Sequence, residues 1–271
     1  MTTSNDRRRI DELLVERGWA RDLREAQALV LRGKVRVRDR PVSKPGVRVP
    51  LEGEIRVVGF KGGYVSRGGL KLEAALSGFA IGVEDRVALD VGASYGGFTD
   101  CLLQSGARFV YAVDVGIDQL ARRLSRDLRV KDLGGRNLSD LGPGDFAEGP
   151  PTLVTVDLSY LSLGRALAEV QRLLGAEVDV VALFKPLFEV HRHFDVRDPA
   201  LYAAAASAMK ALAGAHPVSG VMLSPVRGTR GAIEFFLRVG PPRGSRVPES
   251  DVDAVVGQAL EALAKPPGGG Q

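Results

Sequence analysis

The chain has 271 residues, of which 45% are apolar, so it is long enough for one ordinary domain and a small second one. Its single cysteine, Cys101, excludes a disulfide framework and a cysteine-rich metal site, as is usual for proteins of a reducing cytosol. We find neither a signal peptide nor an apolar run of the roughly 18 residues that span a bilayer, and therefore expect a folded, cytoplasmic protein.

The net charge of +4 is unevenly distributed. Residues 7–48 contain thirteen Lys or Arg residues and six Asp or Glu residues, whereas the rest of the chain is slightly acidic. A basic surface of this kind attracts phosphate backbones, largely without regard to sequence. A solvated helix face is the alternative explanation of these charges.

The basic segment begins with apolar residues at helical spacing, which predict two short helices separated near Gly18. The following run VRVRDRPVSKPGVRV (residues 35–49) alternates apolar and basic residues about a turn, as short strands do. Two helices followed by a small hairpin resemble the RNA-binding module named after ribosomal protein S4, over residues 8–49. That module often has Ser-Arg before its second helix, whereas this chain has Asp22-Leu23, so we expect Arg21 or Arg24 to substitute.

The composition changes after residue 60, where four glycines within residues 62–69 indicate a hinge. We therefore divide the chain into an S4-like RNA-binding domain (1–60), a linker (61–66), a main domain (67–264) and a disordered tail (265–271).

In the main domain, apolar runs of strand length alternate with longer amphipathic runs. This alternation predicts a doubly wound α/β domain with a mainly parallel sheet, whose ligand lies at the carboxyl ends of the strands. The expected strands cover residues 87–92, 109–116, 153–159, 178–185, 218–225 and 232–239. The expected helices cover residues 70–79, 98–106, 118–124, 164–174, 201–214 and 250–264, the last with Ser250 as its N-cap.

The first of these strands leads into a glycine-rich loop in the run ALDVGASYGGFTDCLL (residues 88–103). Its spacing G-x-x-x-G-G differs from the G-x-G-x-x-G of a dinucleotide site, and no lysine follows the loop to hold a nucleotide phosphate. Asp114 ends the next strand, where a carboxylate can accept hydrogen bonds from both hydroxyls of a ribose. These features predict S-adenosylmethionine, an adenosine cofactor without a phosphate anchor. A tight turn needed only for packing is the alternative.

Four charged residues lie at or near the ends of expected elements. Asp157 and Lys185 follow apolar strands, Glu234 falls inside the strand 232–239, and Lys71 begins a helix beside its apolar stripe. A charge inside an apolar strand is costly unless it is paired. Each residue has a structural explanation by itself, such as a cap, a solvated lysine or, for Glu234, a bridge to Arg238. Together they supply two carboxylates and two amines to one edge of the sheet.

The runs YVSRGGLKL, LDVGASYGGFTDCLL, VDVG, DLSYLSL, LFKPLFEV and IEFFL follow the basic segment in this order. They resemble the TlyA or hemolysin-A family of ribosomal RNA methyltransferases, over roughly residues 8–240. The resemblance implies an S4 module joined to an FtsJ-like domain with a seven-stranded, Rossmann-like sheet. It also implies an enzyme that uses S-adenosylmethionine to methylate the ribose 2′-hydroxyls of cytidines. The implied partner is ribosomal RNA or a ribosomal subunit, and neither membrane binding nor a stable protein partner is implied.

The same resemblance assigns residue roles. The catalytic Lys-Asp-Lys-Glu tetrad of the family corresponds to Lys71, Asp157, Lys185 and Glu234. The implied cofactor contacts are Asp90, Gly92, Ser94, Gly96, Gly97, Phe98, Asp114, Val115, Asn137 and Asp157. The implied RNA contacts are Arg8, Arg9, Arg21, Arg24, Arg32, Lys34, Arg36, Lys44 and Arg67.

We expect Lys185 either to accept the ribose proton or to orient the hydroxyl. A lysine with an ordinary pKa of about 10.4 cannot accept that proton near neutral pH, so we expect Lys71 and partial burial to depress the pKa of Lys185. Asp157 and Glu234 would hold the two amines. No metal is required, and we interpret His191, His193 and Asp195 as a solvated or RNA-facing loop instead of a metal site.

Several residues depart from the family pattern. Tyr95 replaces a small Thr, Gly134 an acidic residue, Leu187 a Gln and Ala232 an Asn, and HRHFDVRD (residues 191–198) replaces a glycine-rich loop. Three alternatives therefore stay open. They are a noncatalytic RNA-binding protein, an amino-methyltransferase of RNA bases suggested by Tyr160 in the run DLSY, and a membrane-lysing protein, for which the sequence offers no strongly amphipathic segment.

Overall fold

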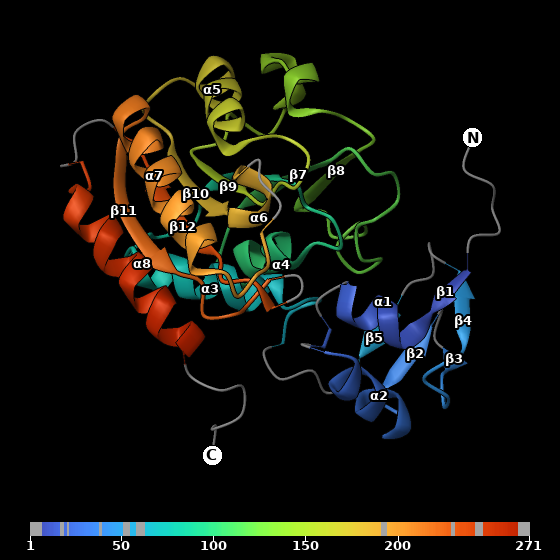
Figure 1. The fold of residues 1–271 in the computed structure, drawn as a ribbon. Helices are drawn as coiled ribbons and strands as arrows, with labels where there is room; N and C mark the ends of the chain where they lie inside the picture. The colour runs from blue at the N-terminus through green and yellow to red at the C-terminus, as the bar shows by residue number, and fades with distance from the viewer. Residues whose placement is uncertain are drawn as a thin grey trace.

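The computed structural model describes residues 7–16, 19–20, 22–37, 40–50, 55–57, 63–190, 194–228, 231–241 and 246–264. Figure 1 shows a small N-terminal body beside a larger one that is built on a sheet. The expected tail, residues 265–271, lies outside the described residues.

The N-terminal body has a hydrophobic core of its own. Buried side chains of its helices, strands and the connection between the helices, including Leu14, Trp19, Val30 and Val35, pack together in it. The predicted pair of helices and the hairpin are confirmed. Strands β3, β2 and β5 form one antiparallel sheet, and β1 pairs with β4 in another. The elements are β1 (Arg7–Arg9), α1 (Ile10–Glu16), α2 (Leu23–Leu31), β2 (Val35–Val37), β3 (Arg40–Pro41), β4 (Arg48–Pro50) and β5 (Ile55–Val57).

The unexpected Asp22-Leu23 pair has a structural explanation. Asp22 is the N-cap of α2, and its Oδ1 accepts a hydrogen bond from the backbone N–H of Glu25 at 2.8 Å. An aspartate is among the favoured N-cap residues because its carboxylate satisfies an otherwise unpaired amide of the first turn. This departure therefore supports the helix locally.

The larger body contains a seven-stranded sheet in the order β11-β12-β10-β9-β6-β7-β8. The five neighbouring strands β10, β9, β6, β7 and β8 run parallel, and β12 runs antiparallel to both of its neighbours, β10 and β11. The chain order reverses at β6, which lies between β7 and β9, and ligands of such sheets bind at this switch point. The strands are β6 (Val87–Val91), β7 (Phe109–Asp114), β8 (Val130–Gly134), β9 (Leu153–Val156), β10 (Asp179–Phe184), β11 (Val218–Leu223) and β12 (Phe235–Val239).

Helices cover both faces of this sheet (Figure 1). Side chains of α3 and α4 pack in one hydrophobic cluster, and those of α5, α7 and α8 pack in another. Among the described residues, no helix is long and apolar enough to cross a membrane. The helices are α3 (Gly68–Gly78), α4 (Gly97–Gln104), α5 (Leu163–Leu174), α6 (Pro186–Glu189), α7 (Pro199–Ala215) and α8 (Glu249–Ala264), with 3₁₀ turns η1 (Leu138–Asp140) and η2 (Pro143–Asp145).

Four details of the predicted elements are wrong. Residues 118–124 form turns instead of a helix, and the edge strand β8 was missed because only Leu133 in it is buried. Glu234 lies just before β12, not inside it. Helix α8 begins one residue before Ser250, the expected N-cap. The core strands and long helices match because their apolar patterns arise from burial on the sheet faces.

Candidate active site

The four charged residues are brought together as two ion pairs. Nζ of Lys71 lies 2.6 Å from Oε2 of Glu234, to which it donates a hydrogen bond. Nζ of Lys185 lies 2.5 Å from Oδ1 of Asp157. Each pair joins residues from distant parts of the sequence, so only the fold could place them in contact.

The sheet topology explains why these residues meet. Asp157 follows β9 and Lys185 follows β10, and these strands are parallel neighbours. Because β12 is antiparallel to β10, its first residue, Phe235, pairs with Phe184 at the end of β10. Glu234, directly before β12, therefore emerges at the same edge as Lys185.

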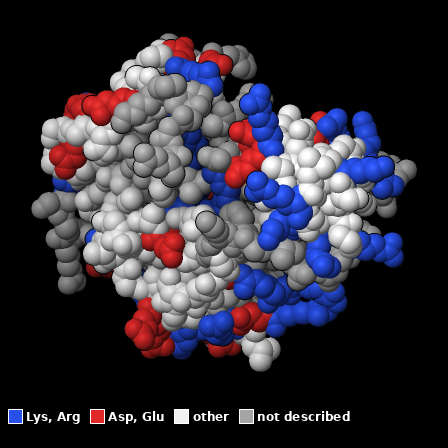
Figure 2. All heavy atoms as spheres, turned by 90° about the horizontal axis from the view of Figure 1, so that it is seen from below, with Lys and Arg blue, Asp and Glu red and all other residues white. Residues whose placement is uncertain are grey.

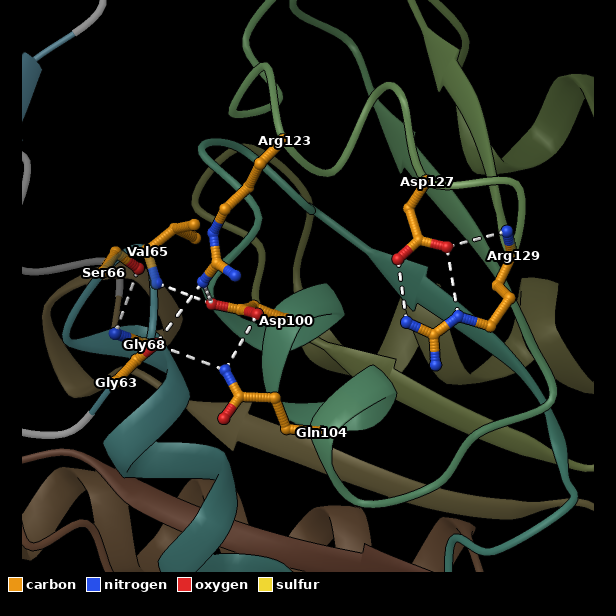
Figure 3. Close-up of polar contacts among 9 residues, drawn as sticks. All are labelled: Gly63, Val65, Ser66, Gly68, Asp100, Gln104, Arg123, Asp127 and Arg129. Carbon is orange, nitrogen blue, oxygen red and sulfur yellow. Dashed lines mark hydrogen bonds and ion pairs between the residues drawn. The ribbon is translucent and has the colours of Figure 1, made fainter.

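Lys71 reaches this edge from the first turn of α3, where its ammonium meets Glu234. The segment before α3 is fixed by Asp100, a fully buried residue of α4 that the sequence reading did not single out. Its carboxylate accepts hydrogen bonds from the backbone N–H of Val65 at 2.6 Å, from Gln104 and from Arg123 (Figure 3). The only local signal was an acidic residue on a helix face that is otherwise apolar.

The pKa of Lys185 contradicts our expectation. Burial alone would lower this pKa, but the negative charges of Asp157 and Glu234 outweigh burial and raise it above the ordinary value. For Asp157, burial favours a higher pKa, but the positive charges of Lys185 and Lys71 outweigh it and lower the pKa. The four residues thus act as one charge network in which Lys185 is an ammonium and Asp157 a carboxylate.

Two further groups contact this network. Nζ of Lys185 donates a hydrogen bond to Oγ of Ser159 at 2.9 Å, and lies 5.7 Å from the centre of the half-exposed Phe188 ring. Oδ1 of Asp157 is enclosed, with Nζ of Lys185 at 2.5 Å as the cation that neutralises it. The sequence reading missed Ser159, a hydroxyl two residues after Asp157 in the run DLSY.

The glycine loop lies beside Asp114, as predicted from the sequence. Oδ2 of Asp114 accepts a hydrogen bond from the backbone N–H of Ser94, and Oδ1 accepts one from Gly116, both at 2.8 Å. Ser94 is exposed and has a φ of +47°, a conformation that costs free energy for a residue other than glycine. The loop is therefore held in a specific, strained shape against the end of β7.

The loop glycines have a packing role, which is the alternative that the sequence left open beside cofactor binding. A methyl group on Gly92 would overlap the carbonyl oxygen of Asp157, and one on Gly97 would overlap Oγ of Ser66 and crowd the backbone of Gly68. A methyl group on Gly96 would overlap the side chains of Leu120 and Leu124. These residues are small because the strand ends and the start of α3 approach the loop closely, which does not require a ligand.

Two of the expected cofactor contacts are inaccessible. Asp90 is fully buried, and its carboxylate accepts hydrogen bonds from Oγ1 of Thr99 at 2.6 Å and Oγ1 of Thr155 at 2.9 Å. Burial raises the pKa of Asp90 to about 6. Phe98 is also buried and packs against Phe236, with ring centres 6.2 Å apart. We therefore correct both residues to structural roles.

Four of the expected cofactor contacts lie on the open side of the loop, namely Ser94, Asp114, Val115 and Asn137. Val115 is 43% exposed directly after Asp114, and Asn137 is exposed. The segment that carries Asn137 is tied to the end of β7 by a hydrogen bond from the backbone N–H of Arg136 to the carbonyl oxygen of Asp114 at 3.1 Å. Residues 94, 114, 115 and 137 thus share one accessible edge.

Lys and Arg side chains gather over the N-terminal body on the face drawn in Figure 2. Arg9 is partly committed to the fold, because it forms an ion pair at 2.7 Å with the fully buried Asp11. Arg8 pairs with Glu16 at 3.0 Å but stays exposed. Among the other expected RNA contacts, the exposed ones are Arg24, Arg32, Lys34 and Lys44, the half-buried ones are Arg36 and Arg67, and Arg21 lies outside the described residues.

The described residues contain no group of three His, Cys, Asp or Glu side chains placed to hold a metal ion. His191 and His193 lie outside the described residues, so the loop interpretation stays a prediction.

Comparison with known proteins agrees with this geometry. Residues 64–239 match the model of the FtsJ-like methyltransferase family. The chain is 41% identical over 240 residues to the 16S/23S rRNA (cytidine-2′-O)-methyltransferase TlyA of Mycobacterium tuberculosis, covering 85% of this chain and 89% of that protein. It is 38% identical over 271 residues to YqxC of Bacillus subtilis, named as a candidate rRNA methyltransferase, covering 96% of each.

A solved structure from Streptococcus thermophilus, named as a candidate hemolysin, superposes with a TM-score of 0.80 at 34% identity, covering 95% of this chain and 97% of that chain. The family match covers more than half of the chain and includes all four charged residues. The chain therefore belongs to the FtsJ-like methyltransferase family.

Proposed function

We propose that this protein transfers a methyl group from S-adenosylmethionine to a ribose 2′-hydroxyl of ribosomal RNA, at a cytidine. The observation that carries the proposal is the pairing of Lys71 with Glu234 and of Lys185 with Asp157 at the edge of the sheet where ligands bind. The similarity to TlyA, whose name specifies cytidine 2′-O-methylation, supports the choice of substrate.

The residues around the glycine loop fit the cofactor. Each oxygen of Asp114 accepts one backbone amide, and a carboxylate oxygen has a second lone pair for a ribose hydroxyl of the cofactor. Ser94, Val115 and Asn137 would hold the adenosine end from the accessible side. The bound cofactor supplies a sulfonium methyl group, which is electrophilic without a metal.

Lys185 acts as an orienting group. Because its pKa is raised, it is an ammonium at neutral pH and cannot accept the proton of the ribose hydroxyl. Its N–H groups instead fix the ribose oxygen beside Asp157. Oδ1 of Asp157 is paired with Nζ of Lys185 at 2.5 Å, and the carboxylate has further lone pairs that would accept the hydroxyl hydrogen.

The order of bond changes makes a carboxylate sufficient. The bound cofactor would supply the methyl group, and the hydroxyl proton would become strongly acidic as the ribose oxygen is methylated. It then passes to Asp157 and on to solvent, so no strong base is needed. Lys71 and Glu234 stabilise this arrangement, because Lys71 lowers the pKa of Asp157 and Glu234 raises that of Lys185.

We also propose the division of labour along the chain. Residues 1–60 form the S4-like RNA-binding domain, 61–66 the linker and 67–264 the methyltransferase domain, followed by a tail. The exposed Arg24, Arg32, Lys34 and Lys44 support an RNA-binding face, because such a face neutralises phosphates. Its contribution would fall steeply with salt concentration.

The test is methyl transfer from tritiated S-adenosylmethionine to ribosomal subunits from cells that lack this protein. We expect incorporation with the unmodified protein, a product identified by nucleoside mass spectrometry as 2′-O-methylcytidine, and a loss of at least about 100-fold for Lys185→Ala. Lys210→Ala is the matched control, because Lys210 pairs with Asp253 at 2.8 Å on the surface between α7 and α8. A base-methylated nucleoside, or equal incorporation by Lys185→Ala, would refute the proposal.

A further inference from the structure

One side chain of the glycine loop contacts the N-terminal body. The hydroxyl of Tyr95 donates a hydrogen bond to the carbonyl oxygen of Ile55 at 2.8 Å. Its ring packs edge-on against Trp19, with ring centres 5.9 Å apart and an interplanar angle of 73°. Tyr95 packs against the hydrophobic clusters of both bodies.

The N-terminal side of this contact belongs to a well-packed core. Trp19 is only 4% exposed, and its backbone N–H donates to the carbonyl oxygen of Leu14 in α1 at 2.7 Å. Ile55 is fully buried in β5, where it pairs with Val37 of β2. A displacement of the N-terminal body would therefore displace the atoms that hold Tyr95.

The other side of the contact is the cofactor edge. Tyr95 directly follows Ser94, whose backbone N–H donates to Asp114, the residue proposed to bind the ribose of the cofactor. The carbonyl oxygen of Tyr95 accepts a hydrogen bond from the backbone N–H of Ala121 at 3.2 Å. Because Ser94 is held at a positive φ, the loop has little freedom to absorb a shift of Tyr95 without moving Ser94.

We propose that Tyr95 is a positioning residue that couples RNA binding by the N-terminal body to cofactor binding at the glycine loop. The inference rests on the proposed function for the identity of the two ligands. RNA bound across both bodies would hold the N-terminal body in place and with it, through Tyr95, the shape of the loop that binds the cofactor. Because such coupling is reciprocal, each ligand tightens the binding of the other by the same factor.

The experiment measures the dissociation constant of S-adenosylhomocysteine by isothermal titration, with and without saturating ribosomal subunits from cells that lack this protein. For the unmodified protein we expect subunits to tighten binding by at least about fivefold, the lower end of typical couplings. Tyr95→Thr, which removes both contacts, brings the ratio of the dissociation constants without and with subunits close to one. Tyr95→Phe, which removes only the hydrogen bond to Ile55, gives an intermediate ratio.

Two controls separate coupling from a general loss of structure. Tyr111→Phe removes a tyrosine hydroxyl that accepts a hydrogen bond from the backbone N–H of Glu148 at 2.8 Å, within the larger body, and leaves the ratio unchanged. Trp19→Phe, altered on the opposite side of the contact, lowers the ratio although Trp19 is proposed to touch neither ligand. The double variant Trp19→Phe/Tyr95→Thr behaves like Tyr95→Thr alone.

A ratio near one in the unmodified protein, or a full ratio in Tyr95→Thr, overturns the inference. These outcomes are distinguishable from failure of the proposed function. If the unmodified protein makes 2′-O-methylcytidine but shows a ratio of one, only the coupling fails. If the ratio depends on Tyr95 but the product carries a base methyl group, only the assigned reaction fails.

Discussion

The ion pair between Lys71 and Glu234 permits a quantitative test of how the site is held together. Nζ and Oε2 are 2.6 Å apart, and the two side chains are only 13% and 6% exposed. Replacing Glu234 with Leu leaves an ammonium in a nearly dry environment, and replacing Lys71 with Met leaves a carboxylate there. Removing one partner of a buried pair costs about 3–5 kcal/mol, because the remaining charge has lost its compensation.

The double variant Lys71→Met/Glu234→Leu removes both charges and fills the space with apolar atoms of similar volume. We expect it to unfold at a higher urea concentration than either single variant, since well-packed apolar substitutes for a buried pair are often neutral or stabilising. Urea unfolding of the four proteins gives the coupling free energy of the pair, which we expect to exceed about 2 kcal/mol.

The surface pair of Lys210 and Asp253 supplies the control. These side chains are 27% and 57% exposed, so their coupling is expected to be about 1 kcal/mol or less. If the costs of Lys71→Met and Glu234→Leu simply add in the double variant, the two residues do not stabilise one another and our account of the charge network is wrong. Both single variants and the double variant lose methyl transfer. The double variant therefore regains stability without regaining activity.

Three further predictions follow from the charge network and the packing. The rate constant of single-turnover methyl transfer stays level between about pH 6.5 and 9, because Lys185 is an ammonium throughout this range. A tenfold rise of this rate constant per pH unit would show that neutral Lys185 is the base instead. Asp90 has a pKa of about 6, above its unfolded value of about 3.9, so its contribution to stability is present below pH 4 and is lost as the pH rises through 6. In urea unfolding, the free energy of unfolding of Asp90→Asn therefore gains up to about 3 kcal/mol relative to that of the unmodified protein between pH 4 and 7. The same difference between the two proteins at both pH values would contradict this. Gly228→Ala places a methyl group against the carboxylate of Glu234 and lowers kcat at least about tenfold. The control Gly257→Ala, where nothing lies within 4 Å of the added methyl group, retains full activity, and equal kcat values for the two variants would refute the steric argument.

The elements of the larger body were largely predictable, because the signals are local. Residues 180–184 of the strand β10, for example, are all apolar and buried, since a central strand is covered on both faces. The edge strand β8 lacks this signal, and residues 118–124 have helical spacing but no helix. Leu120 and Leu124 instead pack over Gly96, so tertiary contacts decided their conformation.

The candidate site was predictable in its membership but not in its electrostatics. The sequence shows Lys71, Asp157, Lys185 and Glu234 at or near element ends, and the sheet topology follows from their order. It does not show that Glu234 precedes β12 instead of lying inside it. The direction of the Lys185 pKa shift depends on which charge is nearest, and Asp157 is closer than any cation.

The sequence by itself thus determined the alternation of strands and helices, the basic N-terminal segment and the set of charged residues, because each depends on neighbours along the chain. Only the tertiary structure decided the ion-pair partners, the protonation of Lys185, the packing role of the loop glycines and the contact of Tyr95 with Trp19. These properties depend on distances between groups as far apart as 163 residues in the chain, which composition and spacing do not encode. Electrostatic and packing free energies change steeply with such distances, so they follow the fold and not the local pattern.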